Sequence, residues 1–247
     1  MPVMIMGACV DLAGYVALAR EHGLRVVVDA AAAIGARHGN GTAIAATGVD
    51  AVCYSFNGNK TITCGGGGAS AAADTALMAR IKHLTTTGRV SRDYDHDVVA
   101  YNYRMTNVQA ALGVAQLERI DAFLERKRQI RDAYATFASR HPGLQPFPEP
   151  AFGTNTHWFS GFWYGGPDLD RCDAFRNHMT AAGIDLRRFW KPIHLQVPYV
   201  DAPASAMPVA DGIWQRIFPL PCSTGLDGAD LDRVLASAEA FWGMSDG

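Results

Sequence analysis

The sequence predicts an α/β fold: a mostly parallel sheet with flanking helices, followed by a small C-terminal α/β domain. Residues 24–29 form a strongly apolar run, which is typical of a strand buried on both faces of a parallel sheet. Residues 51–56 are rich in β-branched and aromatic side chains and predict a second strand. Because residues 11–22 have the apolar spacing of a helix, helices and strands alternate, as they do in βαβ units.

The elements at the start of the chain are predicted in order. Residues 2–6 are expected to form a strand, and residues 11–22 a helix with one apolar face. Residues 24–29 then form the next parallel strand of a βαβ unit.

An unusual stretch follows the strand predicted at residues 51–56. The turn-forming sequence Asn-Gly-Asn comes first, Lys60 follows directly, and four consecutive glycines at 65–68 close the stretch. Such a stretch can be a surface loop with a solvated lysine. A nucleotide-binding phosphate loop is excluded, because Tyr54 stands where that motif requires its first glycine.

A lysine that forms a Schiff base with an aldehyde is the other interpretation. Its amine must lose its proton, which burial or a cationic neighbour promotes. Pyridoxal phosphate binds in this way and also needs a carboxylate against its ring nitrogen. Asp29 can supply that carboxylate, because it ends the apolar run, and open α/β sheets contact ligands at the carboxyl ends of their strands. Asp29 can equally be the N-cap of a helix over the alanines that follow.

The middle of the chain is predicted to be mainly helical. Residues 69–73 are expected to form a strand and residues 75–84 a helix, followed by a polar loop in which His96 is exposed. Thr106 and Gln109 have the spacing of a capping box, which predicts a long helical stretch to about residue 139.

The prolines between residues 141 and 150 are dense enough to mark a domain boundary. We therefore expect two domains, residues 1–140 and residues 141–247. The second is predicted to contain a strand, a helix, an extended stretch and a final helix, at 157–164, 169–182, 184–190 and 229–242. Its aromatic side chains, such as Trp158, are expected to be core or interface residues rather than cofactor contacts.

Composition excludes several classes of function. The net charge is -2 with both signs mixed along the chain, so there is no basic stripe for nucleic acid and no polybasic patch for a membrane surface. No apolar run is long enough to span a membrane, and no signal peptide is expected. The scattered cysteines and unclustered histidines predict neither a disulfide scaffold nor a metal site. We expect a cytoplasmic protein.

Four separated motifs resemble the DegT/DnrJ/StrS family of sugar aminotransferases, in the same order along the chain. They are residues 26–35 around Asp29, residues 54–68 around Lys60, residues 101–118, and the late stretches 189–196 and 220–223. The resemblance covers about residues 2–242. The sequence Asn-Gly-Asn-Lys with its glycine run is most similar to the branch that acts on UDP-linked 4-keto-6-deoxy amino sugars.

The resemblance implies an incomplete large domain of the aspartate-aminotransferase type, with pyridoxal phosphate as the cofactor. Lys60 would carry the cofactor as a Schiff base and move the substrate proton. Asp29 would keep the pyridine nitrogen protonated, and Ser55 would hydrogen-bond the cofactor phosphate. Lys60 also distinguishes the chain from the related dehydratases, which have histidine at that position.

The resemblance further implies a homodimer in which Asn102 reaches the cofactor phosphate of the partner subunit. Without the resemblance, Asn102 is equally a turn or capping residue. His194 and Arg104 would contact the substrate, a nucleotide-linked keto-sugar, while the amino donor would be an amino acid, with glutamate expected. The alternative for His194 is a packed interdomain loop.

The chain also departs from the family pattern. Ala32 replaces a polar residue near the cofactor, and Ala100 replaces a common glycine. In the family, the first βαβ unit of this chain lies in the middle of the large domain, so the chain is expected to be N-terminally truncated and to lack part of the cofactor site. Three functions therefore stay open: a transaminase completed by another chain, an inactive remnant, and a scaffold for protein contacts.

Overall fold

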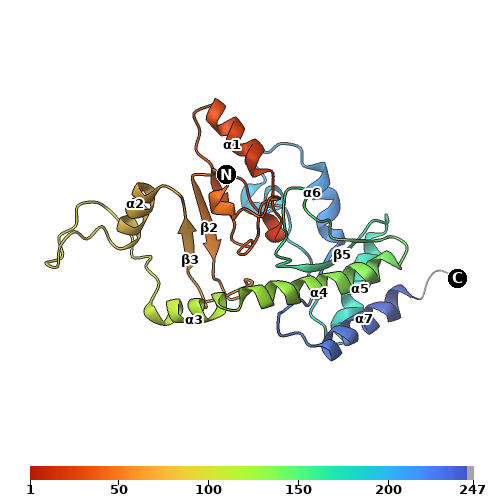
Figure 1. Ribbon diagram of the computed structural model, residues 1–247. Coiled ribbons are helices and arrows are strands. Elements are labelled where there is room, and N and C mark those ends of the chain that lie inside the picture. Colours follow the sequence, from red (N-terminus) through yellow and green to blue (C-terminus); the bar gives the residue numbers. More distant parts are fainter. Residues whose placement is uncertain (244–247) are drawn as a thin grey trace. The chain divides into compact units, whose positions relative to one another are not determined.

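The computed structural model describes residues 1–243 (Figure 1). Its contacts divide the chain into two compact units. The first unit is Met1–Glu125 with Glu149–Trp158, and the second is Arg126–Pro148 with the described part of Phe159–Gly247. The expected domains, residues 1–140 and 141–247, remain a prediction.

The first unit is built on a three-stranded sheet. The strands are β1 (Val27–Asp29), β2 (Ala51–Ser55) and β3 (Gly68–Ala71), in that order across the sheet. β1 and β2 are parallel, whereas β3 runs antiparallel beside β2 (Figure 1). The prediction of an α/β fold is confirmed.

One face of this sheet packs on helix α1 (Leu12–Glu21). Val28 and Val52, from adjacent strands, are completely buried there in one cluster with Leu12 and Val16 of the helix. The side chain of Asp11 caps the helix by accepting a hydrogen bond from the backbone N–H of Gly14 at 2.9 Å. The predicted helix at residues 11–22 is thus confirmed, because both its apolar spacing and its cap are local features.

The strand predicted at residues 2–6 is wrong. Val3 forms a single parallel bridge with Asp29, and the chain then turns into a short 3-10 helix, η1 (Ile5–Gly7). Met6 and Gly7 have φ angles of 56° and 88°, which end the extended conformation after that one bridge.

The remaining helices of the first unit include α2 (Thr75–Thr85) and α3 (Asn107–Leu117). Thr106 and Gln109 form the predicted capping box at the start of α3. The long helix expected to follow is interrupted, and α4 (Ile120–Ser139) begins as a separate helix. The interruption follows a tightened last turn, in which the Arg119 N–H donates to the carbonyl of Gln116, three residues back.

The second unit has an antiparallel sheet of three strands. They are β4 (Leu144–Pro146), β5 (Ser160–Tyr164) and β6 (Ile217–Leu220), with β5 in the centre. Its longer helices are α5 (Leu169–Ala181) and α7 (Gly228–Trp242). Its short helices are α6 (Pro208–Ile213), η3 (Ile193–Leu195), η4 (Val197–Tyr199) and η5 (Trp214–Arg216). The short helix η2 (Ile44–Ala46) belongs to the first unit.

Aromatic side chains form the centre of the second unit. The rings of Phe175 and Phe218 meet edge to face with centroids 4.9 Å apart, and Phe162 of the central strand lies 5.8 Å from Phe218. The extended stretch expected at residues 184–190 forms no strand. β4 and β6 were not predicted, since both are short and each contains a proline.

Candidate active site

Two parallel strands of the first unit place polar side chains at their carboxyl ends. Asp29 ends β1 and pairs with Cys53 in the register of β1 and β2, while Ser55 ends β2. Paired residues share a face of a sheet, and residues two apart on one strand also share a face. Asp29, Cys53 and Ser55 therefore lie on the face opposite the buried pair Val28 and Val52.

Asp29 holds a turn rather than capping a helix. One of its carboxylate oxygens, Oδ1, accepts a hydrogen bond from the backbone N–H of Ala31 at 2.9 Å. The alanines that follow form successive tight turns, in which Ala33 and Ala36 each donate to a carbonyl three residues back. The helix-cap interpretation of Asp29 is thus wrong, and the turn fixes the position of its carboxylate at the strand end.

Lys60 lies at the end of the turn that follows β2. Its backbone N–H donates to the carbonyl of Asn57 at 3.1 Å, and the N–H of Cys64 donates to the carbonyl of Phe56 at 2.9 Å, which closes the loop. Ser55 adds a contact inside the same turn, since its Oγ accepts from the N–H of Asn57 at 3.3 Å. The Lys60 side chain is half-buried, so the surface-loop interpretation with a fully solvated lysine does not hold.

The amine of Lys60 lies against the indole ring of Trp158. The distance from the Lys60 Nζ atom to the ring centroid is 3.7 Å. Trp158 is itself fixed, because its indole N–H donates to the carbonyl of Asn59 at 2.6 Å. A cation held over an aromatic face in this way is attracted by the negative electrostatic potential of the ring.

Burial and charge act on the Lys60 amine in opposite directions. Burial is the larger effect and lowers the pKa of Lys60, while the negative charge of Asp29 raises it. Asp29 can act on this pKa because its carboxylate is within electrostatic range of the amine. The structure therefore brings together the two residues that the sequence singled out from separate strand ends.

Trp158 was expected to be a core or interface residue, and its contact with Lys60 was not predicted. The residue is 6% exposed, so its burial was expected. It reaches the lysine because Glu149–Trp158 returns to the first unit, where the Thr156 hydroxyl donates to the carbonyl of Ala32 at 2.8 Å. Ninety-nine residues separate Asn59 from Trp158, and no local pattern in the sequence pairs them.

Asn102 and Arg104 lie on the loop before α3. Both are exposed, and Asn102 forms an isolated antiparallel bridge with Thr86. Arg104 lines a cavity of about 630 Å³ together with residues of β3 and α2, among them Ser70 and Lys82. In the described part of the chain neither residue forms a hydrogen bond or ion pair with Lys60 or Asp29.

His194 belongs to the second unit, in η3. Its Nε2 atom lies 2.7 Å from the Oδ1 atom of Asp211, and its Nδ1 atom is buried without a hydrogen-bond partner among the described residues. Asp211 was not predicted, since it lies on the separate helix α6. A carboxylate at this distance fixes the orientation of the imidazole ring.

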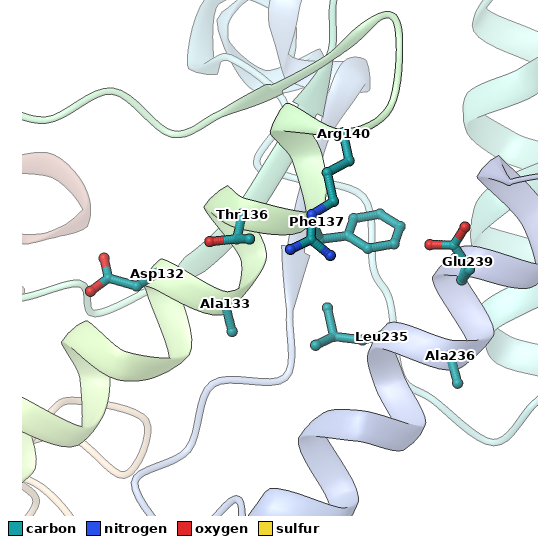
Figure 2. Close-up of a pocket in the computed structure, with 8 residues that line it drawn as sticks. All are labelled: Asp132, Ala133, Thr136, Phe137, Arg140, Leu235, Ala236 and Glu239. Carbon is teal, nitrogen blue, oxygen red and sulfur yellow. The ribbon is translucent and has the colours of Figure 1, made fainter.

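A second cavity, of about 510 Å³, lies in the second unit between α4 and α7 (Figure 2). Ala133 and Leu235 supply apolar side chains from the two helices, whereas Asp132, Arg140 and Glu239 add charges. None of the predicted site residues lines it. In residues 1–243 no helix is long and apolar enough to cross a membrane, and no cluster of side chains there could hold a metal ion.

Residues 1–239 match the DegT/DnrJ/EryC1/StrS aminotransferase family. The GDP-perosamine synthase of Caulobacter vibrioides is 34% identical over 241 residues, which cover 97% of this chain and 64% of that protein. The dTDP-3-amino-3,4,6-trideoxy-alpha-D-glucose transaminase of Streptomyces venezuelae is 30% identical over 240 residues, covering 95% of this chain and 61% of the relative. This chain thus spans less than two thirds of the length of these relatives.

Solved structures of similar proteins share the fold. The crystal structure of DesV from S. venezuelae, in complex with a ketimine intermediate, matches with a TM-score of 0.88 at 27% sequence identity. The match covers 99% of this chain and 65% of the DesV chain. This chain therefore shares the fold of DesV over the part that the two proteins have in common.

Proposed function

Because the chain belongs to the DegT/DnrJ/EryC1/StrS aminotransferase family, whose members depend on pyridoxal phosphate, we propose that it serves in transferring an amino group to a nucleotide-linked keto-sugar. One observation carries the proposal: a half-buried lysine amine, that of Lys60, lies against Trp158 and within electrostatic range of Asp29. The names of the relatives support a sugar nucleotide as the substrate class.

The side chains of the first unit fit this cofactor by their chemistry. Pyridoxal phosphate presents an aldehyde, a pyridine nitrogen and a phosphate, and when bound it supplies a ring that takes up carbanion charge. Lys60 offers an amine for the aldehyde, Asp29 a carboxylate for the ring nitrogen, and Ser55 a hydroxyl for the phosphate. The last two lie on the same face of the sheet, which supports their acting on one ligand.

Lys60 would act first as a nucleophile and then as a base. An amine attacks a carbonyl only without its proton, and burial lowers the pKa of Lys60, which increases the unprotonated fraction near neutral pH. Once released, the same amine would act as general acid and base, removing the α-proton of the amino donor in one half-reaction and supplying a proton to the sugar carbon in the other. Trp158 would keep the amine in place and water away from it.

Asp29 and Ser55 would bind the cofactor and orient it. The turn at Ala31 occupies Oδ1 of Asp29, which leaves Oδ2 to accept a hydrogen bond from a protonated pyridine nitrogen. A carboxylate there keeps that proton on the ring nitrogen. The Ser55 hydroxyl, which accepts from the N–H of Asn57, would donate its own proton to a phosphate oxygen.

We propose that the protein works as a homodimer, with Asn102 reaching the cofactor phosphate of the partner subunit. The apolar surface of α3 supports a second copy as the partner, because Val108 and Leu112 lie one turn apart on the helix and are both exposed. An exposed apolar patch of this kind marks an interaction site. The free thiols of the five cysteines support a cytoplasmic location.

The substrate would be a 4-keto-6-deoxy sugar nucleotide and the donor glutamate. Arg104 is proposed to contact the substrate, and its exposed guanidinium at the rim of a cavity supports this role. His194 is the second proposed contact. In the described structure its Nε2 atom is held by Asp211, so the ring is oriented before any substrate binds.

Adding pyridoxal phosphate to the purified chain tests the proposal. We expect the absorbance band of lysine-bound cofactor, and we expect reduction with borohydride to fix the cofactor on the peptide that contains Lys60. Lys60→Ala should abolish both signals. Lys191→Ala is the matched control, because Lys191 is an exposed lysine and should leave both signals unchanged.

The test also separates the alternatives. A folded sample without the band, or with cofactor spread over several lysines, would overturn the role of Lys60 and favour a remnant or a scaffold. Retention of the band in Lys60→Ala would place the cofactor on another lysine.

A further inference from the structure

A lysine and a cysteine face each other inside the second unit. The Nζ atom of Lys127, on α4, lies 3.7 Å from the Sγ atom of Cys222, which follows β6. Lys127 is 5% exposed and Cys222 is 8% exposed. Lysine is almost never buried to this extent, so the pair is an unusual feature of the core.

The neighbourhood holds this pair in place. Tyr134, on α4, is completely buried. Its hydroxyl donates to the carbonyl of Pro221 at 2.6 Å. This bond anchors the residue before Cys222 to the helix that carries Lys127. The amine and the sulfur are therefore in contact because α4 and the segment after β6 are joined there, ninety-five residues apart in the chain.

The contact favours reaction between the two groups, because a nitrogen that can act as a nucleophile is held beside the sulfur. Burial lowers the pKa of Lys127, so the amine can also lose its proton and become a nucleophile.

We propose that Lys127 and Cys222 form a redox modification site, in which a hydroperoxide oxidises Cys222 and Lys127 then closes a sulfenamide cross-link. In the first step the sulfur attacks a peroxide oxygen, so that an S–O bond forms, the O–O bond breaks and water leaves. The sulfur loses two electrons and the peroxide gains them. The product is the sulfenic acid of Cys222.

In the second step the unprotonated Lys127 amine attacks the oxidised sulfur. An N–S bond forms and the S–O bond breaks, and the hydroxyl leaves as a second water with a proton from the amine. One thiol, one amine and one hydrogen peroxide thus give one sulfenamide and two waters. Sulfenic acids condense with backbone nitrogens in the same way, and here a side-chain nitrogen is already in contact with the sulfur.

The cross-link would join α4 to the segment after β6. A covalent bond that closes a long loop restricts the unfolded chain, which stabilises the folded protein and raises its melting temperature. A thiol reductant would reverse the change, because a thiolate attacks the sulfur and releases the amine.

Treating the full chain with hydrogen peroxide tests the proposal. Cys53→Ser is the background for every sample, since Cys53 is exposed and would be oxidised independently. We expect the intact mass to fall by two hydrogens, a cross-linked peptide pair containing Lys127 and Cys222, and a higher melting temperature that dithiothreitol reverses.

Two variants identify the atoms involved. With Lys127→Met, we expect the reaction to stop at the sulfenic acid, which dimedone then traps on Cys222. With Cys222→Ser, we expect neither product, while Lys191→Met, at an exposed lysine, should behave as the parent chain.

Three results would overturn the proposal. The first is an unmodified Cys222 in a folded, peroxide-treated sample. The second is a sulfenic acid that accumulates although Lys127 is present. The third is the same loss of two hydrogens in Lys127→Met, which would assign the cross-link to a backbone nitrogen.

Discussion

The amine of Lys60 lies 3.7 Å from the centroid of the Trp158 ring, and Trp158 is held there by its hydrogen bond to the carbonyl of Asn59. The ring covers one side of the amine and keeps water from it. A cation over an aromatic face gains about 0.5–2 kcal/mol, which offsets much of the entropy lost when a flexible lysine is held in one position. Burial lowers the pKa of Lys60 and Asp29 opposes this, with burial the larger effect.

Removing the indole ring of Trp158 should bring the pKa of Lys60 closer to the ordinary value of a lysine. In Trp158→Leu, water reaches the amine, and because burial is the largest effect on this pKa, we expect the gain in hydration to outweigh the lost contact with the ring, so that the pKa of Lys60 rises and its reactivity at neutral pH falls. The measurement is the pH dependence of Lys60 acetylation by acetic anhydride, read by mass spectrometry. The loss of buried ring atoms should also reduce the free energy of unfolding by roughly 2–5 kcal/mol.

Trp158→Phe is the matched control for that variant. It keeps an aromatic face and loses the hydrogen bond to Asn59, at a cost of about 1 kcal/mol in unfolding free energy. We expect the pKa of Lys60 to stay near that of the parent chain. Equal acetylation profiles for Trp158→Leu and Trp158→Phe would show that the aromatic ring does not control the pKa of Lys60.

Asp29→Asn should lower the pKa of Lys60 further. The carboxylate raises this pKa in the folded chain, so replacing it with a neutral amide removes a stabilising partner of the charged amine. Acetylation of Lys60 should then begin at lower pH. Titration with pyridoxal phosphate should show weaker binding, because the ring nitrogen loses its anionic partner.

Asp93→Asn, in the exposed polar loop before α3, should change neither measurement. An acetylation profile of Lys60 that is identical in Asp29→Asn and the parent chain would contradict the electrostatic contact between the two side chains.

Leu112→Arg should prevent dimer formation through α3. Leu112 is 51% exposed, so the substitution costs the monomer little, while a charge in an apolar interface is costly. Light scattering after size-exclusion chromatography should show a monomer at concentrations where the parent chain is a dimer. Leu18→Arg is the control, because Leu18 is 53% exposed on α1 and should leave the dimer intact. A dimeric Leu112→Arg would exclude α3 as the interface.

Lys127→Met should make the chain at least as stable as the parent near pH 7. Burial lowers the pKa of Lys127 in the folded state, so proton binding favours the unfolded chain. Below the lowered pKa the folded chain carries the full cost of a buried charge. As pH rises from there toward the ordinary lysine value, that cost disappears. We expect a gain of about 0–2 kcal/mol at pH 7, which shrinks with increasing pH.

Urea unfolding at several pH values measures this difference, with Lys191→Met as the exposed control. A variant less stable than the parent by more than about 1 kcal/mol at pH 7 would show that the contacts of Lys127 outweigh its desolvation.

Local patterns predicted the helices well. α1 and α2 were expected within a residue or so, since each has an aspartate cap directly before its first turn. The N-terminal strand was wrong, and the long helical stretch expected from residue 106 to about residue 139 is divided into two helices. In both cases a local backbone feature decided the outcome: positive φ angles at Met6 and Gly7, and a tightened turn at Arg119.

The sequence by itself determined that Asp29 and Lys60 follow neighbouring strands, because strands and turns can be recognised from a few consecutive residues. Tertiary structure alone decided that Trp158 covers the Lys60 amine and that Lys127 meets Cys222. Such contacts join segments nearly a hundred residues apart, and they depend on how whole elements pack rather than on the residues beside them. The physical reason is that packing acts through space, whereas hydrogen-bonded turns and apolar periodicity act along the chain.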